Sequence, residues 1–237
     1  MSENNLYTLR RSNERGKASH GWLETRYSFS FASYFDEAHM GFRSLRVINQ
    51  DRVAPGAGFP THPHRDMEIF SYVLEGALEH EDSMGNKRKL LPGEIQLMSA
   101  GRGVTHSEYN PSAHEGLHLL QIWIEPATKG IEPSYTEWRP LNAQKTDRKV
   151  LLISPQGQEN SALINQDAEV YRVKLEDGES VGHQLAEGRG LWFQLIKGNA
   201  EIGDETLQEG DALSTETSGD HRLTARGKLE GLLFDLA

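Results

Sequence analysis

The sequence predicts an all-β protein, a sandwich or a barrel, and three observations support this fold class. Short apolar runs rich in β-branched and aromatic residues recur along the chain, as is typical of strands. Glycine, proline, aspartate and asparagine bound these runs, and the 23 glycines supply many turns. Few windows show the apolar period of an amphipathic helix. Together these patterns favour sheets joined by short connections.

The first half of the chain contains four such runs. Each is bounded by turn-forming residues, as expected for a strand. Residues 82–86, Asp-Ser-Met-Gly-Asn, predict a hairpin turn between the second and third runs. The expected strands of this half include residues 47–48, 69–74, 95–98 and 117–124.

The stretch from Glu125 to Arg148 differs from its surroundings, because three prolines interrupt a polar segment. We interpret residues 126–148 as a crossover that begins the second of two domains, with the first at residues 1–125 and the second at residues 126–237. The strand pattern resumes after the crossover. The expected strands of the second half include residues 150–153, 170–173, 191–196 and 232–236.

The composition excludes several classes of function. The formal net charge is −10, which argues against direct contact with nucleic acid, because such contact depends on clustered lysine and arginine. The chain has no cysteine, so disulfides, thiolate catalysis and iron–sulfur clusters are excluded. No window matches a membrane span, and residues 1–11 lack the apolar run of a signal peptide. We therefore expect a cytoplasmic protein without membrane contact.

Two pairs of potential metal ligands carry most of the chemical information: His62 with His64, and His106 with Glu108. One residue separates the members of each pair, so on a strand both side chains point to the same face. Two such strands can direct three imidazoles and one carboxylate to one point, with coordination positions left for water, substrate or dioxygen. A lone His-x-His pair is more often structural or solvent-facing. Pro63 favours the end of a strand over its centre.

The two halves share a weak repeat. Residues 72–76 resemble residues 194–198, and residues 92–94 resemble residues 209–211, which suggests a duplicated β-barrel. A chance similarity between two β halves is the alternative. In this alignment Gln184 and Ala186 correspond to His62 and His64, and the equivalents of His106 and Glu108 lie near Leu223 and Ala225. A shift in register would bring in His183 and His221. We expect the second half to be a metal-free copy, kept for packing or for a separate pocket.

The segments around both ligand pairs resemble the two cupin motifs. The first motif is matched by Gly56, His62, His64, Glu68 and Gly76, and the second by Gly93, Ser99, Gly101, His106 and Asn110. Ser99 stands where proline is common, and two additional residues precede His106. The chain resembles the pirin branch of the bicupins more closely. Over about residues 8–125 the resemblance rests on motifs, and in the second half it rests only on the general pattern of strands. The pirin-like segments are 28–36, 61–67, 72–76, 80–83 and 100–110.

This resemblance implies a bicupin of two stacked cupin barrels, each a double-stranded β-helix, with one metal ion in the N-terminal barrel. The implied ligands are His62, His64, His106 and Glu108, whereas Glu68 is not the usual ligand in pirins. The C-terminal barrel would lack metal ligands. A divalent transition metal is implied, with Fe(II) expected, although nitrogen and oxygen ligands also suit zinc, copper, nickel, cobalt and manganese.

The resemblance also implies an activity. Several pirin-like proteins, bacterial ones included, have quercetin 2,3-dioxygenase activity, and mammalian pirins are nuclear iron-binding co-regulators of transcription. We therefore expect an oxidoreductase that opens flavonols such as quercetin with O2 and releases carbon monoxide. Glu108 is the expected catalytic base, because a ligating carboxylate can also accept the proton of a substrate hydroxyl. The alternatives are a redox-sensing metal protein that acts through a protein partner, and a metal-free or sugar-binding cupin.

The other histidines and aromatic residues receive structural interpretations. His80 and His118 lie on expected strands, where a hydrogen-bonded structural histidine is the more common case. Phe29, Phe31 and Phe35 are expected in the core and not in a pocket.

Overall fold

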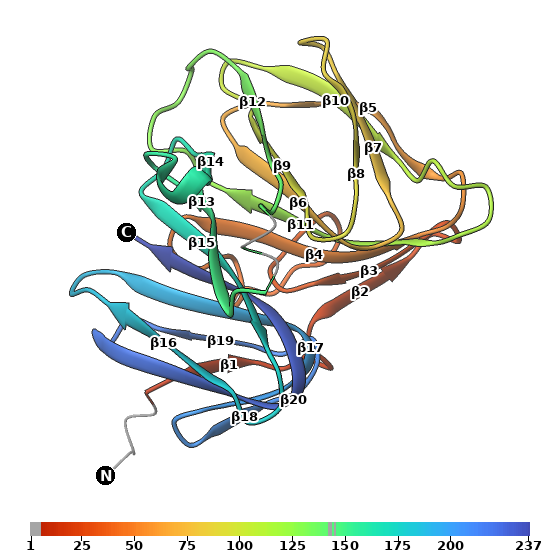
Figure 1. Cartoon of the computed structure of the whole chain (residues 1–237). Coiled ribbons are helices and arrows are strands. Elements are labelled where there is room, and N and C mark those ends of the chain that lie inside the picture. The colour runs from red at the N-terminus through yellow and green to blue at the C-terminus, as the bar shows by residue number, and fades with distance from the viewer. Residues whose placement is uncertain (1–5, 142–143, 145) are drawn as a thin grey trace. The chain divides into compact units, whose positions relative to one another are not determined.

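The computed structural model describes residues 6–141, 144 and 146–237, and their secondary structure is almost entirely β, which confirms the predicted fold class (Figure 1). The chain forms two compact units. The N-terminal unit contains residues 16–140 and 155–166, and the C-terminal unit contains residues 1–15, 141–154 and 167–237. No helix in the described part of the chain is long and apolar enough to cross a membrane.

The N-terminal unit consists of two antiparallel sheets (Figure 1). In order across it, the larger sheet contains β12 (Ser134–Trp138), β9 (Ile95–Ser99), β6 (Glu68–Glu75), β11 (Leu117–Ile124), β4 (Leu45–Val53), β3 (Leu23–Tyr27) and β2 (Gly16–Ser19). The smaller sheet contains β5 (Gly58–His64), β10 (Val104–Tyr109), β7 (Leu78–Asp82) and β8 (Lys87–Leu90). The unit also holds η2 (Gln158–Asn160) and β14 (Ala162–Leu163).

Apolar side chains from both sheets fill the space between them. One core cluster joins Val73 and Leu119 of the larger sheet to Leu78 and Leu90 of the smaller sheet. Burial of such side chains on both sides supplies the main driving force for this packing. The four apolar runs predicted in this half lie in β4, β6, β9 and β11, and the predicted hairpin turn joins β7 to β8.

The C-terminal unit is built around two long strands, β17 (Gly190–Ile202) and β20 (Gly219–Leu236), which pair with each other. On one side of this pair lie β19 (Ala212–Thr215) and β1 (Thr8–Arg10), and on the other lie β15 (Ala168–Leu175) and β13 (Lys149–Ser154). The strand β16 (Ser180–Leu185) pairs with the first part of β20, and β18 (Glu205–Leu207) pairs with the end of β17. The four runs predicted in this half lie in β13, β15, β17 and β20.

The sequence-based boundary between the two domains at residue 125 stays a prediction. Two strands, however, lie in a different unit from the one that this boundary would give them. β1 pairs with β19 and so lies in the C-terminal unit. The predicted crossover contains β12, which pairs with β9 of the N-terminal unit. β12 forms there because Tyr135, Thr136 and Trp138 favour a strand, whereas Pro133 and Pro140 lie just beyond its ends.

The strand pairing also corrects the predicted alignment of the two halves. His183 on β16 lies opposite His221 on β20, in the same way that His62 on β5 lies opposite His106 on β10. His183 therefore corresponds to His62, and the predicted equivalence with Gln184 was wrong by one residue. The alignment slipped because glycine-rich turns carry no register information.

The two histidines of the C-terminal unit have other partners. His183 Nε2 lies 2.7 Å from an oxygen of Asp235, and His221 Nδ1 lies 2.9 Å from the Tyr7 hydroxyl. Two residues beyond each histidine, where the N-terminal unit has His64 and Glu108, stand Leu185 and Leu223, which are buried in the apolar core. This unit therefore offers two of the four potential ligands at the equivalent positions.

His118, on β11, is a buried histidine that the fold keeps neutral. Its side chain is hydrogen-bonded, as predicted, because the Gln50 amide donates to its Nε2 atom at 3.0 Å. Burial, together with the nearby Arg52 guanidinium, lowers the pKa of His118 to about 4. Protonation would remove the lone pair that accepts from Gln50.

We expect His118 to make the metal-free protein less stable in acid. The unfolded chain protonates this histidine near pH 6.5, but the folded chain does so only near pH 4, so stability is lost as the pH falls through that window. His118→Gln removes the effect. In urea unfolding at several pH values, the parent should lose more free energy of unfolding than the variant, by at most about 1.4 kcal/mol per pH unit. Equal losses would contradict this assignment, and His114→Gln, at an exposed loop position, serves as the control.

Candidate metal centre

Strands β5 and β10 bring the predicted ligand pairs together. β5 lies at the edge of the smaller sheet, where Pro60 and Pro63 can be accommodated because an edge strand leaves some backbone groups unpaired. Pro63 stands next to the last residue of β5, as predicted. The antiparallel register sets His62 directly opposite His106.

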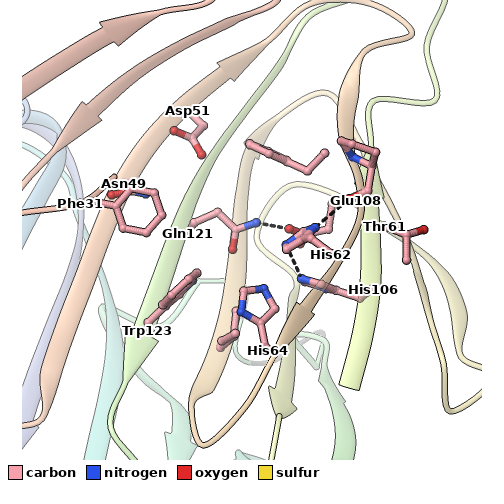
Figure 2. Close-up of a pocket in the computed structure, with 13 residues that line it drawn as sticks. Phe31, Asn49, Asp51, Thr61, His62, His64, His106, Glu108, Gln121 and Trp123 are labelled. Atoms are coloured by element: carbon pink, nitrogen blue, oxygen red, sulfur yellow. Dashed lines mark hydrogen bonds between the residues drawn. The ribbon is translucent and has the colours of Figure 1, made fainter. Parts of the chain in front are cut away.

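Three histidine rings meet between these strands (Figure 2). The Nε2 atoms of His62 and His106 lie 3.1 Å apart, and the ring centres of His62, His64 and His106 are 4.5–4.8 Å apart. One ring nitrogen from each of the three lies within 4.8 Å of the others. Because they face each other so closely, the rings can share one cation through their nitrogen lone pairs.

The surroundings keep these rings in the form that binds metals. His62 Nδ1 lies 2.8 Å from the Pro60 carbonyl oxygen, so the Nδ1–H donates to that oxygen and the Nε2 lone pair points toward His106. Burial, with a smaller contribution from the neighbouring histidines, lowers the pKa of His64 to about 4 and that of His106 to about 3. His64 and His106 are therefore neutral at pH 7, and neutral imidazole is the form that binds metals.

Glu108 lies on the same cavity wall, but other donors hold its carboxylate. The Ser71 hydroxyl and the Gln96 amide donate to Oε1 at 2.8 and 3.2 Å, and the Gln121 amide donates to Oε2. Glu108 is 2 % exposed. A β-bulge between His106 and Glu108 sets the glutamate opposite Phe59. The carboxylate is therefore buried and oriented, and Oε2 keeps a lone pair beyond the one that accepts from Gln121.

The four predicted ligands fall into two overlapping clusters among the described residues. One contains His62, His64 and His106, and the other contains His80, His106 and Glu108. His106 belongs to both, because its Nε2 atom faces His62 while its Nδ1 atom lies 3.4 Å from His80 Nδ1. In the described part of the chain, Glu68 belongs to neither cluster: it accepts a hydrogen bond from Ser99 at 2.6 Å.

The donors to Glu108 were not predicted from the sequence, and they form a polar row on the larger sheet. Ser71 on β6 lies opposite Gln96 of β9 and Gln121 of β11. All three are buried within otherwise apolar strands. A buried polar side chain needs a hydrogen-bond partner, so the polar residues inside these apolar runs were the available signal.

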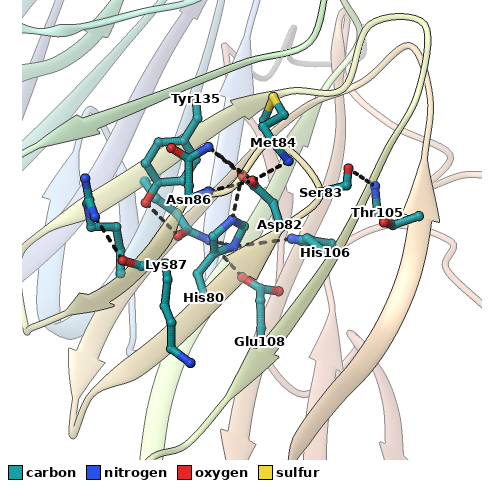
Figure 3. Close-up of polar contacts among 12 residues, drawn as sticks. His80, Asp82, Ser83, Met84, Asn86, Lys87, Thr105, His106, Glu108 and Tyr135 are labelled. Carbon is teal, nitrogen blue, oxygen red and sulfur yellow. Dashed lines mark hydrogen bonds and ion pairs between the residues drawn. The ribbon is translucent and has the colours of Figure 1, made fainter.

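His80 and Asp82 support His106 from behind (Figure 3). The Gln96 amide donates to His80 Nδ1 at 2.9 Å, so the Nε2–H of His80 donates to Asp82 Oδ2 at 3.2 Å. His106 Nδ1 lies 3.4 Å from the same His80 nitrogen, so its N–H shares that one lone pair with the Gln96 amide. Burial alone would raise the pKa of Asp82, but hydrogen bonds from Asn86, His80 and the Met84 amide outweigh it and lower the pKa. His80 is therefore hydrogen-bonded, as predicted, and its position beside His106 orients the His106 ring.

A cavity of about 320 Å³ opens beside the histidines, between the two sheets of the N-terminal unit. Its volume is at the lower end of the range for small-molecule sites. Phe31 forms part of its wall and packs edge-on against Trp123 at a ring-centre distance of 5.4 Å, so its predicted core position was wrong. Phe29 is buried as predicted, whereas Phe35 is 73 % exposed. The three phenylalanines separate because they lie in an irregular turn whose side chains follow no period.

The donor set fits a divalent transition metal. Three mutually facing imidazoles and a nearby buried carboxylate are the nitrogen and oxygen ligands that such ions accept. The Pro60 carbonyl and His80 occupy the outer nitrogens of His62 and His106, as partners of metal-binding histidines commonly do. The N-terminal unit therefore carries the donors of a divalent-metal centre.

Comparisons with known proteins agree with this centre and with the two-unit fold. A family profile described as Pirin matches residues 8–124, and one described as Quercetinase C-terminal cupin domain matches residues 151–236. The quercetin 2,3-dioxygenase of Escherichia coli K12 is 49% identical over 228 residues, which cover 96% of this chain and 97% of that protein. A pirin-like protein of Caulobacter vibrioides is 38% identical over 223 residues, covering 94% and 96%.

Solved structures give the same result. The crystal structure of YhhW from Escherichia coli matches with a TM-score of 0.94 at 48% identity, covering 98% of this chain and 97% of that one. A structure of bacterial pirin YhhW in complex with nickel(II) matches with a TM-score of 0.93 at 47% identity, covering 97% and 98%. The two-cupin fold predicted from the motifs is confirmed, and the chain belongs to the pirin family.

Proposed function

We propose that this chain is a quercetin 2,3-dioxygenase of the pirin type, a metal-dependent oxidoreductase that opens flavonols with O2 and releases carbon monoxide. The observation that carries the proposal is the meeting of three imidazoles on the wall of an apolar cavity that also holds a buried carboxylate. The E. coli relative at 49% identity bears the name of this activity.

The proposed metal ligands are His62, His64, His106 and Glu108, and the proposed metal is Fe(II). When bound, a divalent ion supplies a Lewis acid that stabilises an oxyanion and lowers the pKa of a hydroxyl group beside it. The solved structure of bacterial pirin YhhW is a complex with nickel(II), which is an ion of the same class and supports a divalent metal here.

Glu108 is the proposed proton acceptor. Its carboxylate is anchored by the Ser71 hydroxyl and by the amides of Gln96 and Gln121, so it cannot rotate freely away from the cavity. A fixed carboxylate beside a flavonol hydroxyl accepts its proton without reorganisation of the site.

The apolar walls of the cavity perform the remaining tasks. Phe31, Phe59 and Trp123 offer ring faces and edges to a planar ligand, and Ile69 closes part of the floor. Such a lining orients an aromatic substrate and excludes water from the reacting enol.

The experiment is a turnover assay on protein purified without oxygen and loaded with metal. We expect about one metal ion per chain, loss of quercetin absorbance in air, and carbon monoxide in equal amount. Metal binding without carbon monoxide would overturn the enzymatic proposal and favour the regulatory alternative. Loading with Fe(II), Ni(II), Cu(II), Zn(II), Co(II) and Mn(II) in parallel tests the metal: Fe(II) should give the highest rate.

His80→Gln should weaken metal binding about tenfold, because His106 loses the acceptor that orients its ring. The measurement is a competition titration of the metal-free protein against a chelator. His118→Gln is the matched control, since it removes a buried histidine of the same unit that lines a different cavity. Identical metal affinities for the two variants would show that His80 does not support the site.

A further inference from the structure

The cavity beside the histidines has a second polar side. Asn49 and Asp51 on β4 line it from the larger sheet, whereas His62, His64 and His106 line it from the smaller sheet (Figure 2). The two β4 residues are separated by one position, so they point to the same face of the strand. None of the chemistry assigned above to the metal or to Glu108 uses them.

Asn49 has an unused hydrogen-bonding atom. Its side chain is 5 % exposed, and its Oδ1 atom has no hydrogen-bond partner among the described residues. The opposite residue on β11 is Gln121, but that amide is already engaged with Glu108 and Ser71. An unpaired buried acceptor costs about 1–3 kcal/mol, so a ligand donor that reaches this atom would recover that cost.

Asp51 adds a buried hydrogen-bond acceptor to this side of the cavity. Its side chain is 3 % exposed. Burial raises the pKa of the nearby Tyr27, and the negative charge of Asp51 raises it further. An ionised carboxylate accepts hydrogen bonds and donates none. A ligand group that reaches Asn49 Oδ1 and Asp51 must therefore be a donor, and an anionic group would be repelled.

The other residues that line the cavity favour a ligand with a planar aromatic body. The cavity is also lined by the rings of Phe31, Phe59 and Trp123, which suit a flat aromatic body. On a planar enol of the flavonol class, the neutral donors are phenolic hydroxyls. The ligand therefore needs an enol at the histidine side and at least one phenol at the β4 side.

We propose that Asn49 and Asp51 are specificity-determining residues that bind a phenolic hydroxyl of the substrate on the side of the cavity opposite the histidines. The inference rests on the proposed function and narrows its substrate class: polyhydroxylated planar enols are preferred over enols that carry no further hydroxyl. The two residues take no part in proton transfer, so they act on binding and on KM.

The test compares quercetin with 3-hydroxyflavone, which keeps the enol and lacks the phenolic hydroxyls. Dissociation constants are measured without oxygen by quenching of tryptophan fluorescence, and KM and kcat are measured in air. Asn49→Leu should weaken quercetin binding about tenfold, as loss of one buried hydrogen bond predicts, and raise KM without lowering kcat. Asp51→Asn should act in the same direction. Binding of 3-hydroxyflavone should stay within about twofold of the parent, which also shows that the variants are folded.

Thr61→Val is the matched control, because Thr61 lines the same cavity from β5. It should leave the preference for quercetin unchanged. Equal losses for both flavonols, or no loss for quercetin in Asn49→Leu, would overturn the inference. If the variants lose quercetin binding selectively but the parent releases no carbon monoxide, the inference holds and the proposed reaction fails. If carbon monoxide forms and the variants keep the parental KM, the reaction holds and the inference fails.

Discussion

Glu108→Gln should lose at least about 99% of its quercetin turnover while keeping most of its metal. An amide cannot accept the proton of the flavonol hydroxyl, and general-base catalysis contributes on the order of a hundredfold or more. The three histidines of the first cluster remain, so the ion keeps its nitrogen donors. The measurement is carbon monoxide release per bound metal ion, with metal content determined on the same sample.

The substitution will also cost stability, for a reason visible in the structure. The new amide group would face the donors from Ser71, Gln96 and Gln121, so one buried donor loses its acceptor. The expected loss in free energy of unfolding is about 1–3 kcal/mol. Glu81→Gln is the control, because Glu81 is an exposed carboxylate that pairs with Lys87. A Glu108→Gln protein that turns over at the parental rate would remove Glu108 as the base.

His106→Leu should abolish metal binding, with an affinity at least about a hundredfold lower. His106 is the one residue common to both clusters of potential ligands in the described part of the chain, so neither survives its loss. Leucine fills a similar volume in this buried position, which keeps the fold intact. Metal content after reconstitution and gel filtration is the measurement, and turnover should disappear with the metal.

The control for this variant is His114→Leu, at an exposed loop position. It should bind about one ion per chain, like the parent. Retention of the metal by His106→Leu at parental affinity would mean that the ion binds elsewhere. His80→Gln, which changes only the support of His106, should give an intermediate loss.

The sequence predicted best those elements whose structure depends on residues close together in the chain. The run at residues 117–124 coincides with β11, because burial of nearly all its side chains makes it almost continuously apolar. The His-x-His and His-x-Glu pairs were recognisable since a strand period of two leaves only one geometry for them. Pro63 marked the edge of a sheet for an equally local reason.

What the sequence did not predict depends on contacts between distant segments. The pairing of β1 with β19 joins residues about two hundred positions apart, and no local signal encodes it. The row of Ser71, Gln96 and Gln121 exists only once three strands are in register. The equivalence of His183 with His62 likewise emerged from cross-strand pairing, because similar turns permit alignments that differ by one residue.

The most direct test of the account is the position of the metal ion, found by anomalous diffraction from crystals of the protein loaded with one equivalent of Fe(II) or Ni(II). We predict a single peak between His62 Nε2, His64 and His106 Nε2, within coordination distance of a Glu108 oxygen. A peak on the far side of His106, bound by His80 and Glu108 without His62 and His64, would contradict the account.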